Sequence, residues 1–451
     1  MKQIARRAVS LLIVLALFLT GMGVLLTKFA VRGGDWATYP TNRHLFNDGK
    51  LAKAGSITDI YGLTLASTQD GVRSFADDST IRRATFHAVG DLKGKVATSM
   101  HSAFLTQLTG YDLVNGAYSF SDAGNDITLT LDAELCETAY KALGRYSGTV
   151  GVYNYKTGEI VCMVSTPAAD PANMPESADK GLYVNRLLSG IYAPGSIFKL
   201  VTATAAIENL REYNIIEYSC SGGVMIEDEW VSCLGNHGTQ NIRQALTNSC
   251  NAYFAQLAMF IGHDTMTKTA DKLGFNKAFT MDGIKCTASR YDVKNARNIE
   301  LAWSGMGQYN DTVNPLHYLT FIGAIANGGV PKSPFLIGDI RSPKGLPVPF
   351  FRFTQGSRMM SAETAQTLSD MMRNNVTENY GEYNFKGLEL CAKTGTAETQ
   401  DDTPHSWFVG FCRNEEKPYA FVVIAENAGA GIGVASHIAA TVLNEAASVE
   451  E

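Results

Sequence analysis

The apolar residues of this chain are distributed unevenly, and the longest uncharged stretch comes first. Residues 8–27 contain no charged side chain, and an apolar helix of about 20 residues spans a hydrocarbon core of ~30 Å. Lys2, Arg6 and Arg7 precede the stretch and fewer basic residues follow it, which favours an amino terminus in the cytoplasm. A cleaved signal peptide is the alternative, but residues 28–32 offer no small-x-small cleavage site. We therefore expect a retained membrane anchor with the rest of the chain outside the membrane.

A second pattern begins near residue 124. Apolar residues alternate with threonines over 127–131, which predicts a half-buried strand, and residues 132–143 follow with helical spacing. Residues 149–155 and 159–165 are two strand-like runs, and the Lys-Thr-Gly sequence at 156–158 is typical of a hairpin turn. We therefore expect a strand, a helix and a hairpin in succession.

The remainder of the chain is mostly helical before it returns to strands. Several helical segments are predicted between residues 195 and 325, and Ser361 is typical of an N-cap that starts another helix. Three further runs have the apolar or alternating residues of strands: 388–396, 407–411 and 419–426. A last helix is predicted over 434–444. Strands at both ends of a region with helices between them indicate an α+β domain whose sheet is completed late in the chain.

Composition narrows the function classes. Hydrophobic residues make up 45% and charged residues 18% of the 451, which excludes a disordered chain. The net charge is −6, and a chain without a basic excess is not expected to bind nucleic acid. The histidines form no H-E-x-x-H motif or close pair and the eight cysteines form no C-x-x-C, so we expect no metal site and no cofactor.

The cysteines allow two interpretations. Cys220 and Cys233 flank a short segment that contains glycines, and export would permit a disulfide between them. Buried free thiols are the alternative for most cysteines of the chain. Both interpretations stay open at this point.

A serine and a lysine mark a candidate nucleophilic site. Pro194 and Gly195 precede an apolar helical run, so Ser196 is expected in the first turn, where free backbone N–H groups favour a developing negative charge. Lys199 follows three residues later and therefore shares a helix face with Ser196. A serine hydroxyl needs a base to take its proton. Burial lowers a lysine pKa from its ordinary value of about 10.4, which makes Lys199 a candidate base.

Two further motifs lie in settings that local structure does not explain. Lys393-Thr394-Gly395 lies within a strand-like run, where a glycine indicates close approach of another backbone or of a ligand. The Ser-x-Asn pattern occurs once in the chain, at Ser249 and Asn251, and precedes another helical run.

Ser-x-x-Lys and Lys-Thr-Gly each occur a second time. Residues 177–180 repeat the first spacing in a polar stretch without an apolar helix behind it, which favours a solvated loop. Residues 156–158 repeat the second, and the hairpin turn explains that copy fully. The copies in apolar sequence are therefore the candidates for chemistry, because a buried polar pair requires a reason.

The three motifs, in this order along the chain, resemble the penicillin-binding protein and serine β-lactamase superfamily. Further segments are similar to transpeptidase domains of that family: 151–171, 185–186, 305–308, 314–316 and 326–329. The resemblance covers about residues 124–447. Residues 55–66 are similar to the start of the pedestal domain of class B penicillin-binding proteins, although Ala54 and Ile60 stand where that family usually has arginines.

The resemblance implies an α+β transpeptidase fold, in which an antiparallel five-stranded sheet carries helices on both faces. Three units are then expected: a cytoplasmic tip and transmembrane anchor over 1–27, a small pedestal or dimerisation-like domain over 28–123, and the transpeptidase domain over 124–451. The segment between anchor and transpeptidase domain is too short for a glycosyltransferase module, which indicates class B.

The resemblance also implies a peptidoglycan D,D-transpeptidase that cross-links stem peptides through a serine acyl-enzyme and is acylated by β-lactams. It implies these catalytic residues: Ser196, Lys199, Ser249, Asn251 and Lys393. It implies these substrate-binding residues: Thr394, Gly395, Thr396 and Trp407, with Trp407 on the rim of the cleft.

Each implied residue has a role. Ser196 attacks the penultimate D-Ala carbonyl, and its backbone N–H forms the oxyanion hole with that of Thr396. Ser249 relays a proton to the leaving amine, while Asn251 holds the amide of the acyl donor and orients the motif lysine. Lys393 binds the terminal carboxylate together with the two threonines that follow it.

The implied partners are stem peptides, their lipid-linked precursor, β-lactams and a separate membrane glycosyltransferase. A membrane-anchored D,D-carboxypeptidase or β-lactamase is the nearest alternative activity. The Glu-x-x-Leu-Asn of class A β-lactamases does not occur between the second and third motifs, so a penicillin adduct is expected to leave slowly. A non-catalytic wall-synthesis scaffold or β-lactam sensor is the alternative from another class. All motif residues are present, however, and the segment before the span is too short for a signalling module.

Overall fold

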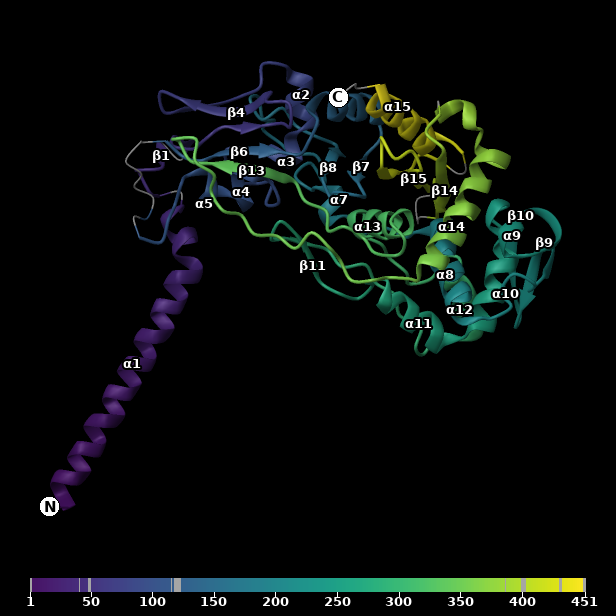
Figure 1. The fold of residues 1–451 in the computed structure, drawn as a ribbon, viewed down its shortest axis with the longest axis horizontal. Helices are drawn as coiled ribbons and strands as arrows, with labels where there is room; N and C mark the ends of the chain where they lie inside the picture. The colour runs from purple at the N-terminus through teal and green to yellow at the C-terminus, as the bar shows by residue number, and fades with distance from the viewer. Residues whose placement is uncertain are drawn as a thin grey trace.

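The structure is a computed structural model, and it describes residues 2–39, 41–47, 50–114, 116, 123–385, 387–398, 403–429 and 432–448. Three parts make up the molecule: a long amino-terminal helix, a small domain and a larger domain (Figure 1).

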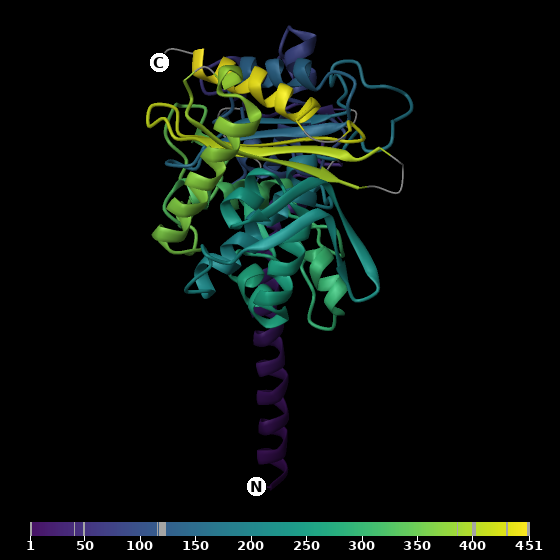
Figure 2. The ribbon, with the colours of Figure 1, turned by 90° about the vertical axis from the view of Figure 1, so that its right-hand side faces the viewer.

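Helix α1 (Lys2–Ala37) projects from the rest of the molecule, as Figures 1 and 2 show. Within the described ranges it is the one helix long and apolar enough to cross a membrane, a property that an anchor and a signal sequence share. The helix does not end at the predicted boundary after residue 27, and Gly33 near its carboxyl end lies against Tyr111 of the small domain. The helix continues through residues 28–37 because nothing in this segment interrupts the helical hydrogen bonding. Its carboxyl end therefore reaches the small domain.

The small domain is built on a five-stranded sheet with the order β13-β6-β3-β4-β5. Its strands are β3 (Ile57–Thr58), β4 (Thr64–Gln69), β5 (Val72–Phe75), β6 (Asp126–Leu129) and β13 (Ile337–Arg341). The short helices α2 (Ser79–Ala84), α3 (Phe86–Val89), α4 (Met100–Ala103) and α5 (Leu105–Leu108) follow β5, and the hairpin β1 (Phe46–Asn47)–β2 (Lys50–Leu51) precedes β3. Ile57, Ile127 and Ile340 are buried in this domain.

The predicted boundary between residues 123 and 124 does not coincide with this sheet. Strand β6, which the pattern predicted correctly, pairs in parallel with β3 and antiparallel with β13. The small domain is therefore made from three separate segments of the chain. Alternating burial predicts that a strand forms but carries no information about the strand beside it.

An ion pair joins the small domain to the larger one. The Arg82 guanidinium on α2 donates two hydrogen bonds of 2.7 Å to the two carboxylate oxygens of Asp170. These bonds lower the pKa of Asp170. His87 on α3 lies 2.9 Å from the carbonyl oxygen of Leu182 and supports the same contact.

The larger domain has its own five-stranded sheet, with the order β14-β15-β16-β7-β8 and every pair antiparallel. Its strands are β7 (Gly148–Asn154), β8 (Ile160–Thr166), β14 (Leu390–Ala397), β15 (His405–Cys412) and β16 (Tyr419–Ala425). Nearly every residue of these strands is buried, which requires cover on both faces.

Helices supply that cover. The helices α6 (Ala133–Leu143) and α15 (Val434–Ser448) pack together on one face, and α13 (Pro315–Ala326) and α7 (Arg186–Ser189) contact the other (Figure 2). The predicted α+β class and the five-stranded antiparallel sheet with helices on both faces are thus confirmed. The predicted N-cap is confirmed as well, since Oγ of Ser361 accepts the N–H of Thr364 at the start of α14 (Ala362–Asn375).

A helical lobe stands beside the β14 edge of the sheet (Figure 1). It contains the turn η1 (Gly195–Phe198) and the helices α8 (Lys199–Asn209), α9 (Ile242–Thr247), α10 (Asn251–Ile261), α11 (His263–Lys272) and α12 (Asn298–Ser304). It also contains the hairpin β9 (Tyr218–Ile226)–β10 (Glu229–Gln240), which the sequence analysis did not predict, and a shorter one, β11 (Phe279–Met281)–β12 (Ile284–Cys286).

Candidate active site

The candidate nucleophile lies where the helical lobe meets the sheet. Gly195 has φ of +54° and its N–H donates a 3.0 Å hydrogen bond to the carbonyl of Gly307. A side chain on Gly195 would collide with the backbone of Thr396 on β14. Ser196 is half-buried in the turn η1, directly before α8. The prediction that Ser196 occupies a first helical turn is confirmed.

The Lys199 ammonium group is fully buried next to this serine. Its Nζ lies 3.0 Å from Oγ of Ser196, 2.6 Å from the carbonyl oxygen of Ser249 and 2.7 Å from Oδ1 of Asn251. Burial lowers the pKa of Lys199 to about 8, which brings a neutral amine within reach near neutral pH.

The geometry around Nζ suits a base. A neutral amine has two N–H groups and one lone pair. The two carbonyl acceptors, on Ser249 and Asn251, accept the two N–H groups at short distances. The lone pair is then left to face the hydroxyl of Ser196, from which a base must take the proton.

The second motif connects this lysine to a second one. Ser249 has a left-handed backbone conformation with φ of +51°. Residues other than glycine adopt this conformation only where the surrounding structure stabilises it. The Oγ of Ser249 lies 3.2 Å from Nζ of Lys199 and 3.0 Å from Nζ of Lys393. Asn251 begins α10 and its Nδ2 donates to the carbonyl oxygen of Ser232 at 3.0 Å.

Lys393 is buried on strand β14 and donates to its neighbour's carbonyl, that of Thr394, at 2.9 Å. Burial and the nearby charge of Lys199 lower the pKa of Lys393 well below its ordinary value. The three side chains therefore form a continuous path, from the first lysine through the Ser249 hydroxyl to the second.

Strand β14 approaches the nucleophile closely. A Cβ on Gly395 would stand 2.8 Å from Cγ2 of Ile197 and 3.1 Å from the carbonyl oxygen of Pro194. The predicted reason for this glycine, close approach of another backbone, is confirmed. Thr396 is half-buried one residue further on, and its carbonyl oxygen accepts a 3.3 Å hydrogen bond from Gln308.

The segment that contains these residues also matches a known protein family. Positions 148–444 match the model of the penicillin binding protein transpeptidase domain, which is well over half of the chain. The chain belongs to the penicillin-binding protein transpeptidase family. The match begins at the first residue of β7 and ends within α15, so it covers the whole five-stranded sheet of the larger domain.

Curated relatives extend the match. Peptidoglycan D,D-transpeptidase PbpA of Mycobacterium tuberculosis is 26% identical over 336 residues, which are 67% of this chain and 68% of the relative. The PbpA of Mycolicibacterium smegmatis is 26% identical over 342 residues, 68% of each chain.

Solved structures agree on the fold. PBPA of Mycobacterium tuberculosis superposes with a TM-score of 0.77 at 22% identity, covering 88% of this chain and 99% of that one. The D,D-transpeptidase domain of a peptidoglycan glycosyltransferase from Eggerthella lenta superposes with a TM-score of 0.74 at 26% identity, covering 88% and 98%. The Mycobacterium tuberculosis protein has also been solved as a penicillin G acyl-enzyme complex.

Two residues expected to bind substrate in this penicillin-binding family member also make contacts within the protein. Thr394 is on the opposite face of β14 from Lys393, where its Oγ1 and backbone N–H each lie 3.2 Å from the hydroxyl of Tyr380. Thr394 therefore supports the strand through Tyr380. Its role as a substrate contact stays a prediction, as does that of Thr396, which shares its face of β14 because successive side chains of a strand alternate between its faces.

Trp407 is the second of these residues. It is fully buried rather than on the rim of a cleft. Its Nε1 donates 3.1 Å to the carbonyl of Ala193 and its ring packs edge-on against Tyr192. The side chain therefore supports the segment that carries the nucleophile.

Several supporting contacts escaped the sequence analysis because they come from distant segments. Tyr380 supports Thr394, and the hydroxyl of Tyr318 donates 2.6 Å to the carbonyl of Ile197. The Asn314 amide donates to the carbonyls of Leu188 and Gly190. The family-like segments 305–308 and 314–316 were the available signals: Gly307 accepts the N–H of Gly195 in the nucleophile turn, and Asn314 holds the end of α7.

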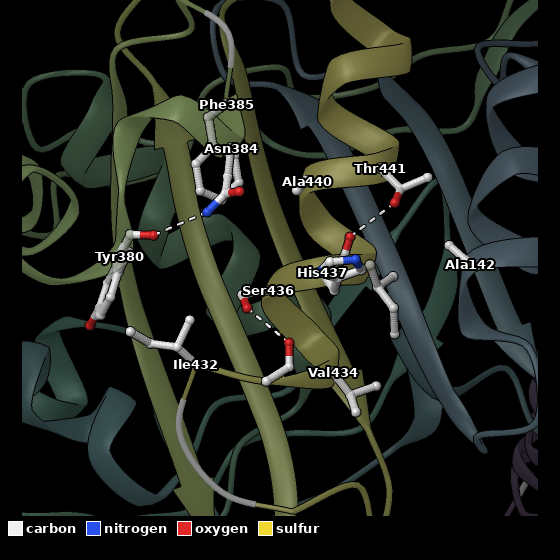
Figure 3. Close-up of a pocket in the computed structure, with 12 residues that line it drawn as sticks. Ala142, Tyr380, Asn384, Phe385, Ile432, Val434, Ser436, His437, Ala440 and Thr441 are labelled. Carbon is white, nitrogen blue, oxygen red and sulfur yellow. Dashed lines mark hydrogen bonds between the residues drawn. The ribbon is translucent and has the colours of Figure 1, made fainter.

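A hollow of about 600 Å³ lies apart from these catalytic residues, between α15 and the segment that follows α14 (Figure 3). The residues that line it include Tyr380, Phe385, Ile432, Val434 and Ala440. None of the five predicted catalytic residues lines it. Tyr380 connects the hollow to β14 through its contact with Thr394.

Proposed function

We propose that this protein is a peptidoglycan D,D-transpeptidase that cross-links stem peptides and is acylated by penicillins. The observation that carries the proposal is the fully buried Lys199 within 3.0 Å of the Ser196 hydroxyl, with both of its N–H directions occupied by carbonyl oxygens. Membership in the penicillin-binding family and the names of the PbpA relatives support the same reaction.

In the acylation step, neutral Lys199 takes the hydroxyl proton of Ser196 while Oγ attacks the carbonyl carbon of the penultimate D-Ala. The negative charge that develops on the carbonyl oxygen faces the backbone N–H groups of Ser196 and Thr396. The peptide bond then breaks, and the proton returns through Ser249 to the amine of the departing D-Ala. The product is an ester of Ser196.

In the second step, an amine of another stem peptide attacks the ester carbonyl. The amine loses its proton along the same path and Ser196 recovers its own, which leaves a new peptide bond. A β-lactam follows the first step alone, since its ring opens without releasing the leaving group.

Lys393, Thr394 and Thr396 together are the proposed binding site for the terminal carboxylate of the donor. Gly395 contributes by its lack of a side chain, which brings β14 against the nucleophile turn. Asn251 holds Lys199 and presents its amide to the donor.

The proposed location of the protein rests on the long apolar helix α1. We propose that α1 is a retained single-pass anchor and that the transpeptidase domain lies on the extracytoplasmic side, where its lipid-linked precursor and stem peptides are found. A separate membrane glycosyltransferase is the proposed partner, because it would supply the glycan strands whose peptides this domain joins.

Labelling by a fluorescent penicillin tests the proposal. We expect full-length protein to form a stable adduct on Ser196, mapped by mass spectrometry, and Ser196→Ala to form none. Ser177→Ala is the matched control, because it removes the serine of the second Ser-x-x-Lys, and it should label like wild type. Labelling that survives Ser196→Ala would refute the proposal. Rapid turnover of a cephalosporin would favour a β-lactamase instead.

A further inference from the structure

Three cysteines and a histidine converge beside the catalytic motifs. Cys220 lies on β9, Cys233 and His237 lie on β10, and Cys250 is the middle residue of the Ser-x-Asn motif. One potential ligand atom from each, three Sγ and one imidazole nitrogen, lies within 4.8 Å of all the others. The hairpin and the motif thus meet at a cluster of soft ligands (Figure 1 shows β9 and β10 next to α9 and α10).

The spacings fit a tetrahedron. Zinc binds sulfur at about 2.3 Å and imidazole nitrogen at about 2.0–2.1 Å, so a regular tetrahedron places two sulfurs about 3.8 Å apart and sulfur and nitrogen about 3.6 Å apart. The Sγ atoms of Cys233 and Cys250 are 3.8 Å apart. Nδ1 of His237 is 3.5 Å from Sγ of Cys233 and 3.7 Å from that of Cys220.

A disulfide fits these atoms less well. All eight cysteines of the chain lie in the described ranges and are free thiols. The 3.8 Å between Cys233 and Cys250 is far longer than an S–S bond of about 2.05 Å. Of the two interpretations of Cys220 and Cys233, the free thiols agree with the structure.

The backbone is shaped to present the four groups. The pairing of β9 with β10 is irregular between Ser232 and Asn236 and again between Asn236 and Gly238. Cys233 lies within the first irregularity and His237 within the second. Such bulges redirect side chains in a strand. The backbone N–H of Asn251 donates to Sγ of Cys233 at 3.2 Å, a contact that stabilises a thiolate.

We propose that Cys220, Cys233, His237 and Cys250 bind one zinc ion as a closed tetrahedral site. Three thiolates and one imidazole are a ligand set typical of structural zinc, and four protein ligands leave no open position for catalysis. Binding displaces the thiol protons of the three cysteines to solvent. The sequence hides the site, because its one short spacing is Cys-x-x-x-His and the other ligands lie more than ten residues away.

The ion would act on the reaction through position alone. Cys250 is bonded covalently to Ser249 and Asn251, and both of these contact Nζ of Lys199. Zinc would therefore fix the hairpin to the motif that holds the base, with Cys250 as a positioning residue. This consequence rests on the proposed function, whereas the site itself does not.

Metal content tests the site. We expect full-length protein, purified in detergent without chelator and supplied with zinc, to hold about one zinc per chain by mass spectrometry of the element. His237→Ala and Cys233→Ser should lose most of it. Cys286→Ser is the matched control, because Cys286 is buried outside the cluster, and it should retain the metal.

Three results would overturn the site: wild type without zinc, zinc retained by His237→Ala, or a disulfide-linked peptide that joins Cys220 and Cys233. Cobalt substitution of wild type keeps the test open where a variant does not fold. Intense sulfur-to-cobalt charge-transfer absorption is expected from three thiolates, and its absence from cobalt-treated protein would also overturn the site.

The positioning role has its own readout. Removal of zinc by a chelator should lower the rate constant of penicillin acylation about tenfold, with little change in the non-covalent affinity, and added zinc should restore it. An unchanged rate would remove the positioning role and leave the site. Zinc-loaded wild type that is never acylated would refute the proposed function while the metal site stands.

Discussion

The chain carries Ser-x-x-Lys twice, and the two copies lie in opposite environments. Ser177 and Lys180 are exposed, in a segment between β8 and α7. In the other copy Lys199 is fully buried and surrounded by oxygen acceptors. The same residues at the same spacing therefore lie in opposite surroundings, and burial lowers the pKa of Lys199.

The two Lys-Thr-Gly copies repeat the contrast. Lys156 is exposed in a hairpin turn, where its Nζ reaches the side-chain oxygen of Asn327 at 3.4 Å. Lys393 is buried in β14 next to the Ser249 hydroxyl. A short motif is therefore expected to be catalytically competent only where the fold buries it away from solvent.

The largest expected effect separates the two copies of Ser-x-x-Lys. Lys199→Met should lower the rate constant of penicillin acylation by about 10²–10⁴-fold, because the base is lost while the aliphatic volume stays. Lys180→Met should leave the rate unchanged. The comparison would fail if both variants acylated alike when measured by stopped-flow or gel-based labelling.

A somewhat smaller loss is expected at the second motif pair. Lys393→Ala should lower acylation by about 10²–10³-fold, since a preorganised positive group beside the donor carboxylate and Ser249 is removed. Lys156→Ala is the matched control in the exposed copy. Equal rates for Lys393→Ala and wild type would show that burial alone does not identify a working lysine.

The pH dependence of the acylation rate tests the role of Lys199 directly. With the pKa of Lys199 lowered to about 8, acylation should rise about tenfold between pH 7 and pH 9 and then level, because only the neutral amine is a base. A profile that is flat over this range would contradict the assigned base.

Stability should change in the same direction. The unfolded chain keeps the lysine proton up to a pKa of about 10.4, whereas the folded chain loses it above about 8. The unfolded state therefore binds more protons between these values, and stability rises with pH there. Thermal unfolding of wild type and Lys199→Met at both ends of the window measures the difference, which Lys180→Met should not change.

The smallest effect is expected at Thr394. Thr394→Val removes one buried hydrogen bond to Tyr380 and should cost about 1 kcal/mol of unfolding free energy, with little change in acylation. Thr396→Val should instead weaken acylation and leave stability nearly unchanged. A strong acylation defect in Thr394→Val would show that this hydroxyl also contacts the substrate.

Most of the catalytic geometry was predictable, because each motif is short and its residues are local. Ser196 precedes Lys199 by one helical turn, and Gly395 allows a close approach that its strand setting already indicated. Trp407 was expected on the rim of the cleft and is buried, because a family motif names residues without stating which face each side chain occupies.

The features that could not be predicted depend on contacts between segments that are far apart in the sequence. The alternation at residues 127–131 predicted β6, yet β3 and β13 became its neighbours only in the fold. The convergence of Cys220, Cys233, His237 and Cys250 likewise depends on bulges in a hairpin, and no spacing rule for short motifs describes such bulges.

The pairing of β6 with β13 has a consequence for how the chain matures. Residues 126–129 leave the ribosome long before residues 337–341 are synthesised, so one edge of β6 is at first without its final neighbour. Unpaired edges invite association with other chains, and non-local pairing slows folding. A fragment truncated before β13 should therefore aggregate, although it retains Ser196, Lys199 and Ser249.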